Sequence, residues 1–174
     1  MAEQGNFAIR RSFLLPLGLL LALSVTLFAA CLVQGEPAAK VAILGFILLP
    51  VVVLFIESAF RRAVVREDEI TVAKFLRAKT LRLAEVTAVD TVQVRKRAFL
   101  TLSAGDDFII LSNAYADFPR LVRTLLARVP ASAVSEETRQ MAAAPPRKST
   151  DVVSCWLAVA LVALILFIQL GSRS

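Results

Sequence analysis

The chain has 174 residues, of which 57% are hydrophobic, with 20 basic and 14 acidic side chains. A soluble domain of this size is usually about 45–50% apolar. The charges are unevenly distributed, because residues 13–33, 41–56 and 152–170 contain none. This pattern excludes both a plain cytosolic globule and a compact bundle buried wholly in a membrane. It predicts a membrane-anchored protein with one small soluble domain.

The residue types present exclude several kinds of catalytic site. The chain contains no histidine, which removes Ser–His and Cys–His nucleophile pairs, HExxH metalloproteases and imidazole proton relays. Cys31 and Cys155 both lie in or at the edge of apolar stretches, without CxxC or zinc-ligand spacing. We interpret them as buried thiols that pack as small hydrophobic side chains. We therefore expect no enzymatic activity, no cofactor and no metal site.

Two apolar segments near the start of the chain are predicted to be membrane helices. Residues 13–33 reach about 30 Å as a helix, which is the thickness of a hydrocarbon core. The second segment, residues 38–57, has an uncharged part at 41–56 that reaches only about 24 Å. Lys40 and Glu57 can extend from its ends toward the membrane surfaces, so the segment is still expected to span.

The link between these segments, QGEPAAK, is short and contains Gly35 and Pro37, so the two helices must run antiparallel. Residues 1–60 are therefore predicted to form an N-terminal transmembrane hairpin. The third apolar segment, residues 152–170, is long enough to cross a membrane unaided. Trp156 lies near its start, where an indole suits the membrane interface.

The charges that flank the three segments predict their orientation. The QGEPAAK link carries one glutamate and one lysine, whose charges cancel. The opposite ends of the segments are flanked by basic residues, namely Arg10, Arg11, Arg61, Arg62, Arg66, Arg147 and Lys148. By the positive-inside rule, the N-terminus and the soluble domain are predicted to be cytoplasmic and the C-terminus external.

An alternative interpretation of the first segment stays open. Two arginines, an apolar run and the sequence FAAC at residues 28–31 together resemble a signal peptide with a lipoprotein cleavage box. Cys31 would then be a lipidation site. Phe28 stands where a leucine is usual, and the apolar run continues past Cys31, so a membrane helix explains the same residues. The soluble domain is cytoplasmic under either interpretation.

Residues 61–130 predict a small antiparallel β domain. Short runs rich in Val, Ile, Thr and Phe, which are typical of strands, occupy residues 62–66, 70–77, 81–83, 86–94, 98–103 and 108–112. The acidic sequences EDE at 67–69 and AGDD at 104–107 are interpreted as turns, because Asp and Gly favour turns and neither has calcium-loop spacing. The short links favour an antiparallel meander.

The pattern changes to a helical period after the last of these strands. Six apolar residues are spaced as one face of an amphipathic helix: Phe118, Leu121, Val122, Leu125, Leu126 and Val129. Asp117 is predicted to be the N-cap, and Pro130 to stop the helix. Residues 131–151 are predicted to form a flexible linker, in which Ser135 could cap one short helical turn.

A meander of about six strands followed by one capping helix, attached to membrane helices, resembles the bacterial pleckstrin-homology-like (PH-like) membrane proteins. The residues that carry the likeness are 64–70 (VVREDEI), 83–89 (LAEVTAV), 98–112 with its Gly-Asp turn, and 113–126. The resemblance implies an α+β fold, with three transmembrane helices plus a small antiparallel PH-like domain, in a bacterial inner membrane. It also implies a binding or scaffolding module. A full PH barrel has one strand more than we expect here.

Six basic residues are predicted to bind the anionic leaflet or a protein partner: Arg77, Lys79, Arg82, Arg95, Lys96 and Arg97. Each cation near such a leaflet contributes on the order of 1 kcal/mol, although a solvated, mixed-charge surface is the alternative. Nucleic-acid binding is not expected, because aromatic residues do not alternate with the basic run.

Two functions remain open from the sequence. The first is a non-enzymatic membrane protein that displays its domain to a partner or to the leaflet. The second is an accessory or assembly subunit of a larger membrane complex.

Overall fold

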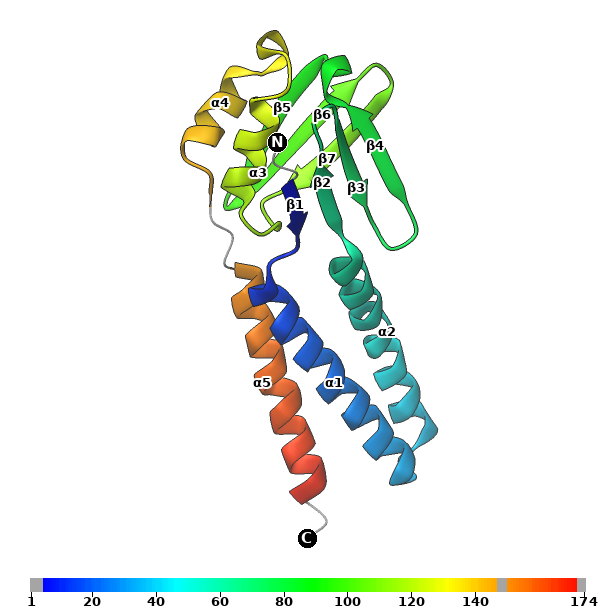
Figure 1. Ribbon diagram of the computed structural model, residues 1–174. Coiled ribbons are helices and arrows are strands. Elements are labelled where there is room, and N and C mark those ends of the chain that lie inside the picture. The colour runs from blue at the N-terminus through cyan, green and yellow to red at the C-terminus, as the bar shows by residue number, and fades with distance from the viewer. Residues whose placement is uncertain (1–4, 147–149, 172–174) are drawn as a thin grey trace. The chain divides into compact units, whose positions relative to one another are not determined.

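The computed structural model describes residues 5–146 and 150–171 (Figure 1). The fold is mixed α+β, with three long apolar helices and two small antiparallel sheets. The described residues divide into two compact units, a β unit made of residues 5–10 and 60–146 and a helical unit made of residues 11–59 and 150–171.

The long helices are α1 (Arg11–Val33), α2 (Ala38–Phe60) and α5 (Thr150–Gly171). Each is long and apolar enough to cross a membrane, which confirms the three helices predicted from the apolar segments. All three are slightly longer than predicted, because a helix continues into polar flanking residues that the uncharged stretch leaves out.

Within the helical unit, α1 packs against α5. Leu17, Leu27 and Cys31 of α1 are buried, as are Cys155 and Val159 of α5. Cys31 therefore lies inside a continuous helix as a small buried side chain.

Phenylalanine side chains that lie over glycines bring α2 and α1 into contact. A Cβ atom on Gly18 of α1 would lie 3.3 Å from Phe55 of α2, and one on Gly45 of α2 would lie 3.3 Å from Phe28 of α1. Each ring thus occupies the space that a larger residue would fill on the opposite helix.

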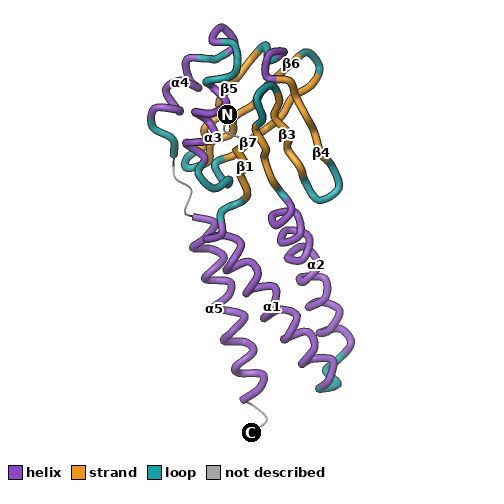
Figure 2. The backbone as a smooth tube through the Cα atoms, in the orientation of Figure 1, coloured by secondary structure: helices purple, strands orange, loops and turns teal. Residues whose placement is uncertain are grey.

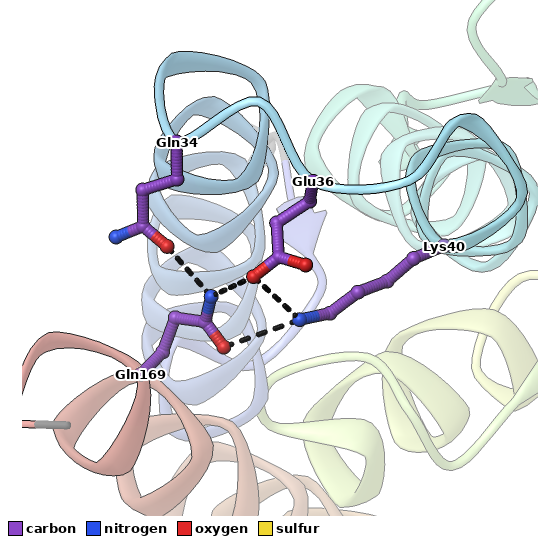
Figure 3. A network of polar contacts seen from close by, with 4 residues as sticks. All are labelled: Gln34, Glu36, Lys40 and Gln169. Atoms are coloured by element: carbon purple, nitrogen blue, oxygen red, sulfur yellow. Dashed lines mark hydrogen bonds and ion pairs between the residues drawn. The ribbon is translucent and has the colours of Figure 1, made fainter.

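A polar cluster ties the end of α5 to the turn between α1 and α2 (Figure 3). The side-chain amide of Gln169 donates to the side-chain oxygen Oε1 of Gln34 at 2.6 Å and to the carboxylate of Glu36 at 2.7 Å. Lys40 lies 3.0 Å from Glu36 and donates to Gln169 at 3.3 Å. Hence α1 and α5 run parallel and α2 antiparallel, so the start of α1, the end of α2 and the start of α5 share one end of this unit.

The β unit contains two antiparallel sheets joined by the short 3-10 helix η1 (Leu83–Glu85), as Figure 2 shows. The four-stranded sheet has the order β1 (Gly5–Ala8), β2 (Arg62–Val65), β3 (Glu69–Ala73) and β4 (Ala78–Arg82). The three-stranded sheet has the order β5 (Ala88–Val94), β6 (Arg97–Ala104) and β7 (Asp107–Ser112). The antiparallel meander predicted after residue 61 is confirmed, including the turn at Gly105, whose φ is 57°.

The first strand was missed by the sequence analysis, which assigned all of residues 1–60 to the membrane hairpin. Residues 5–8 instead form β1, which pairs with β2 from Gly5↔Val65 to Ala8↔Arg62. The stretch is only four residues long, too short for a recognisable alternation. Consequently the helices α1 and α2 are inserted between two neighbouring strands of one sheet.

The predicted strand at 70–77 is also wrong in its second half. β3 ends at Ala73, and the amide of Lys74 donates to the carbonyl of Arg77 at 2.7 Å to close a tight turn. No glycine or proline marks this turn, so the composition looked like a continuous strand. β4 then begins at Ala78 and takes the place of the strand predicted at 81–83.

The helix α3 (Phe118–Leu126) covers the core of the β unit as predicted. Its buried face consists of Phe118, Leu121, Val122 and Leu125. Asp117 is the N-cap residue as predicted, but it has a left-handed backbone with φ of 51° and its side chain accepts no capping hydrogen bond. Aspartate tolerates that conformation better than most residues do.

Most of the predicted linker is folded. Within residues 131–146, the 3-10 helix η2 (Ala131–Ala133) is followed by α4 (Glu136–Ala143), which lies beside β5 in Figure 1. Ser135 caps α4 as anticipated and accepts from the amide of Thr138 at 3.4 Å. Thr138 and Met141 are buried, so this segment is held by packing that its small, polar composition did not suggest.

Candidate functional site

The structure separates one of the six predicted binding residues from the others. Arg82 ends β4 and lies 3.1 Å from Glu85, beside the β2–β3 turn, where the amide of Leu83 donates to Asp68. Arg77 lies in the β3–β4 turn, at the other end of β4, about 16 Å away along an extended strand. Arg82 therefore belongs to a different end of the β unit.

The other predicted residues lie on two turns and two strands. Arg95 and Lys96 form the β5–β6 turn, where Arg95 has a φ of 55°, and Arg97 begins β6. Lys79 lies on β4, with its ammonium 2.9 Å from Asp107.

A loop between β7 and α3 connects the β5–β6 turn to residues that border the helices in the chain. The side-chain amide of Asn113 donates to the carbonyls of Lys96 at 2.8 Å and Pro146 at 2.9 Å. The guanidinium of Arg10 donates to the carbonyl of Asn113 at 2.7 Å. Arg10 directly precedes α1 and Pro146 lies a few residues before α5, so this loop holds two of the chain's three connections to the helices.

Tyr115 in the same loop holds the third connection. It is fully buried, and Arg61, the residue after α2, donates from Nε to its hydroxyl at 3.3 Å. The guanidinium of Arg61 also lies 5.7 Å from the centroid of the ring. Burial raises the pKa of Tyr115 above its ordinary value, while the positive charge of Arg61 acts in the opposite direction. The phenol therefore stays neutral and serves as a fixed hydrogen-bond partner.

The β3–β4 turn combines exposed apolar and basic side chains. Phe75 and Leu76 are 49% and 83% exposed, between Lys74 and Arg77. The ring of Phe75 lies 5.3 Å from that of Phe60, the last residue of α2. Phe75 and Leu76 are not among the predicted binding residues, because the sequence predicts a strand over residues 70–77. Two cations around an apolar pair were the signal that could have revealed them.

A groove opens near this turn, along the seam where β4 and β7 face each other as the unpaired edges of the two sheets. Its volume is about 450 Å³. Four cationic residues line it, namely Arg61, Lys74, Arg77 and Lys79. Apolar lining comes from Val72 of β3 and from Phe108, Ile109 and Ile110 of β7.

The β3–β4 turn and the adjacent groove together form a surface suited to bind anions and apolar groups. Within residues 5–146 and 150–171, no three His, Cys, Asp or Glu side chains are grouped so that they could hold a metal ion. The ammonium of Lys79 lies 4.9 Å from the centroid of Phe108, which places a cation directly over an apolar surface.

Comparison with known proteins does not assign the chain to a family. No family model, no curated protein and no solved structure matches it.

Proposed function

We propose that this chain is a non-enzymatic integral membrane protein whose three long helices span a membrane and whose β unit lies on the cytoplasmic side. The length and apolar character of the helices support membrane insertion. Arg10 and Arg11 at the start of α1, and Arg61 and Arg62 after α2, support the orientation by the positive-inside rule. The predicted contribution of residues 147–148 to this rule falls outside the described residues.

The pairing of β1 with β2 supports the same topology. Ala8 and Arg62 are cross-strand partners, so the chain leaves the sheet for α1 and returns from α2 at adjacent positions. Both outer ends of the hairpin must then be on one side of the membrane. The pairing excludes the case in which one helix crosses alone, and it agrees with a hairpin in which both cross.

The order of elements supports a PH-like domain in the β unit. Four strands form one sheet, three form the next, and α3 follows. The sequence predicts one strand fewer than a full PH barrel has, and β1 supplies this missing strand. With this resemblance we place the protein in the inner membrane of a bacterium.

The function that this geometry supports best is contact with the anionic inner leaflet through the β3–β4 turn. The observation that carries the proposal is the contact between Phe75 and Phe60, because Phe60 ends α2 and thereby ties the turn to the end of a span. Exposed Phe75 and Leu76 suit the interfacial region. Lys74 and Arg77 on either side would each add on the order of 1 kcal/mol near anionic lipid.

Lipid-borne quenching tests this contact on the full chain. A fluorophore is attached to Leu76→Cys in a background in which the two free cysteines, Cys31 and Cys155, are replaced by alanine. The protein is placed in nanodiscs that contain headgroup-nitroxide lipid, with and without phosphatidylglycerol. A label on Glu67→Cys is the control, because Glu67 is exposed in the β2–β3 turn, which lies beside Arg82 at the far end of the unit.

We expect strong quenching at position 76, increased by phosphatidylglycerol, and weak quenching at position 67. Equal quenching at both positions would contradict leaflet contact.

A second candidate, an accessory subunit of a membrane complex, is supported by α2. Across the described residues, α2 buries none of its side chains, and large ones such as Phe46 and Leu49 are exposed. A photoreactive residue at Phe46 distinguishes the two environments in native membranes. Adducts with one discrete protein would support the complex, whereas adducts with lipid alone would argue against it.

A further inference from the structure

The groove between β4 and β7 has a cation where a core residue would be expected. In the β3–β4 register, Ile70 pairs with Leu81 and Val72 with Lys79. Cross-strand partners share one face of a sheet, and Ile70, Val72 and Leu81 are all buried on the inner face. Lys79 thus stands at an inward-facing position, at the open mouth between the two sheets.

The cations around this mouth exceed the carboxylates. Asp107 accepts from Lys79 in an exposed ion pair, which contributes little stability. Among the described residues, no carboxylate lies within 4 Å of Lys74 or Arg77. Arg61 interacts with the neutral phenol of Tyr115. The groove therefore carries a net positive charge that a bound anion would neutralise.

The same groove has apolar surface that an inorganic anion would leave uncovered. Phe108 and Ile110 lie on β7 opposite Ser103 and Thr101, on the outer face of the three-stranded sheet. They are 53% and 43% exposed, although outward positions of a solvated sheet are normally polar. A ligand that covers them needs an apolar part next to its negative charge.

We infer that this groove binds one anionic phospholipid. Lys74, Arg77 and Lys79 bind its phosphate, and Phe108 and Ile110 contact its glycerol and proximal acyl carbons. The inference rests on the proposed function, because a lipid reaches the groove only if the β unit lies at a membrane surface. Arg61 supports that access, since it lines the groove and directly follows the last residue of α2.

The test is a titration of the full chain in micelles of a non-ionic detergent. Three probes are compared by calorimetry: dihexanoyl phosphatidylglycerol, dihexanoyl phosphatidylcholine and inorganic phosphate. We expect saturable binding of one phosphatidylglycerol per chain, with phosphatidylcholine and phosphate at least about tenfold weaker. The double variant Lys74→Gln/Arg77→Gln removes two exposed cations and should weaken phosphatidylglycerol binding by at least about tenfold.

A matched control removes two charges elsewhere. Arg66→Gln/Arg82→Gln lowers the net charge equally at the far end of the unit, and phosphatidylglycerol binding should be unchanged. Phe108→Ala, at a half-exposed position, tests the apolar contact independently of charge and should weaken phosphatidylglycerol binding severalfold. Circular dichroism and gel filtration establish that each variant is folded before it is titrated.

Three results would overturn the inference: wild-type affinity in the Lys74/Arg77 variant, equal loss in the control variant, or phosphatidylcholine binding as tightly as phosphatidylglycerol. Phosphate binding as tightly as the lipid would overturn the lipid assignment in favour of a free anion. The quenching experiment and the titration can fail independently. Quenching measures proximity to a bilayer, whereas the titration is done in micelles without a bilayer. Absent quenching with intact phosphatidylglycerol binding would refute leaflet contact alone.

Discussion

Replacing Thr138 by valine should weaken the attachment of α4 to β5 without leaving a cavity. The hydroxyl of Thr138 is fully buried and donates to the carbonyl of Val89 at 3.0 Å. It also lies 2.9 Å from the hydroxyls of Thr91 and Ser135. Valine keeps the shape of the side chain and removes all three contacts.

The expected cost follows from what each partner loses. The carbonyl of Val89 still accepts from the amide of Ser135 at 3.1 Å, so it is not left unsatisfied. The hydroxyls of Thr91 and Ser135 each lose a partner at a half-buried position. We expect a loss of about 1–2 kcal/mol, since a hydrogen bond contributes about 1 kcal/mol net and an unmade buried one costs more.

Hydrogen exchange followed by mass spectrometry measures this loss locally. In the wild-type chain, peptides from residues 131–146 should be protected. Thr138→Val should accelerate their exchange roughly 5- to 30-fold, which corresponds to about 1–2 kcal/mol. Thr87→Val is the matched control, because Thr87 is exposed and its hydroxyl makes one hydrogen bond, to Ser103 at 3.2 Å.

Complete exchange of residues 131–146 at the earliest time point in the wild type would refute the reasoning, because it would show a flexible linker. An equal effect of Thr138→Val and Thr87→Val would show that burial of the hydroxyl is not the cause.

Three further substitutions test other contacts. Phe7→Ala, at a buried position in β1, should cost about 3–5 kcal/mol and lower the thermal midpoint of the β unit, whereas Asn6→Ala at an exposed position should not. Gly45→Leu presses on Phe28 and should cost about 1–3 kcal/mol, seen as a lower midpoint for the helical unit and disproved by an unchanged one. Gln169→Leu removes three hydrogen bonds, with Gln34, Glu36 and Lys40, and should weaken the attachment of α5 by about 1 kcal/mol, measured as increased exchange at its end; unaltered exchange would contradict the polar cluster.

The parts of the fold that were predicted correctly depend on long, periodic patterns. Uncharged apolar runs define α1, α2 and α5, because only a membrane or a buried core accepts such segments. Six apolar positions between Phe118 and Val129 predicted α3, and four of them are buried in it. The helix ends at Leu126, before the predicted stop at Pro130, so Val129 lies outside it. Alternation and turn residues were sufficient for β5 to β7.

The parts that were missed depend on contacts between distant segments. β1 is short and is stabilised by a partner more than fifty residues away, as the Ala8↔Arg62 pair shows. α4 contains few apolar residues, and its position depends on Thr138 reaching β5. The turn at residues 74–77 has no special turn residue. In each case tertiary contacts determine a conformation that local composition leaves undecided.

The candidate site was predictable in charge but not in position. Basic residues were recognised at Arg77 and Lys79, yet nothing in the sequence shows that Arg82 lies at the opposite end of the unit. The apolar part of the site was hidden as well. In the sequence, Phe108 and Ile110 look like ordinary strand residues. Only their pairing and exposure in the structure show that they face outward.

Insertion of α1 and α2 between β1 and β2 has a consequence for biosynthesis. Gly5–Ala8 is synthesised before either helix and finds its partner, Arg62–Val65, only after both. In the proposed topology, correct membrane integration of the hairpin brings the two strands into the same compartment, and the sheet closes. If one helix fails to cross, the strands are left on opposite sides of the bilayer with exposed edges, a form that proteases and chaperones can recognise. Closure of the sheet would thus report that integration has succeeded.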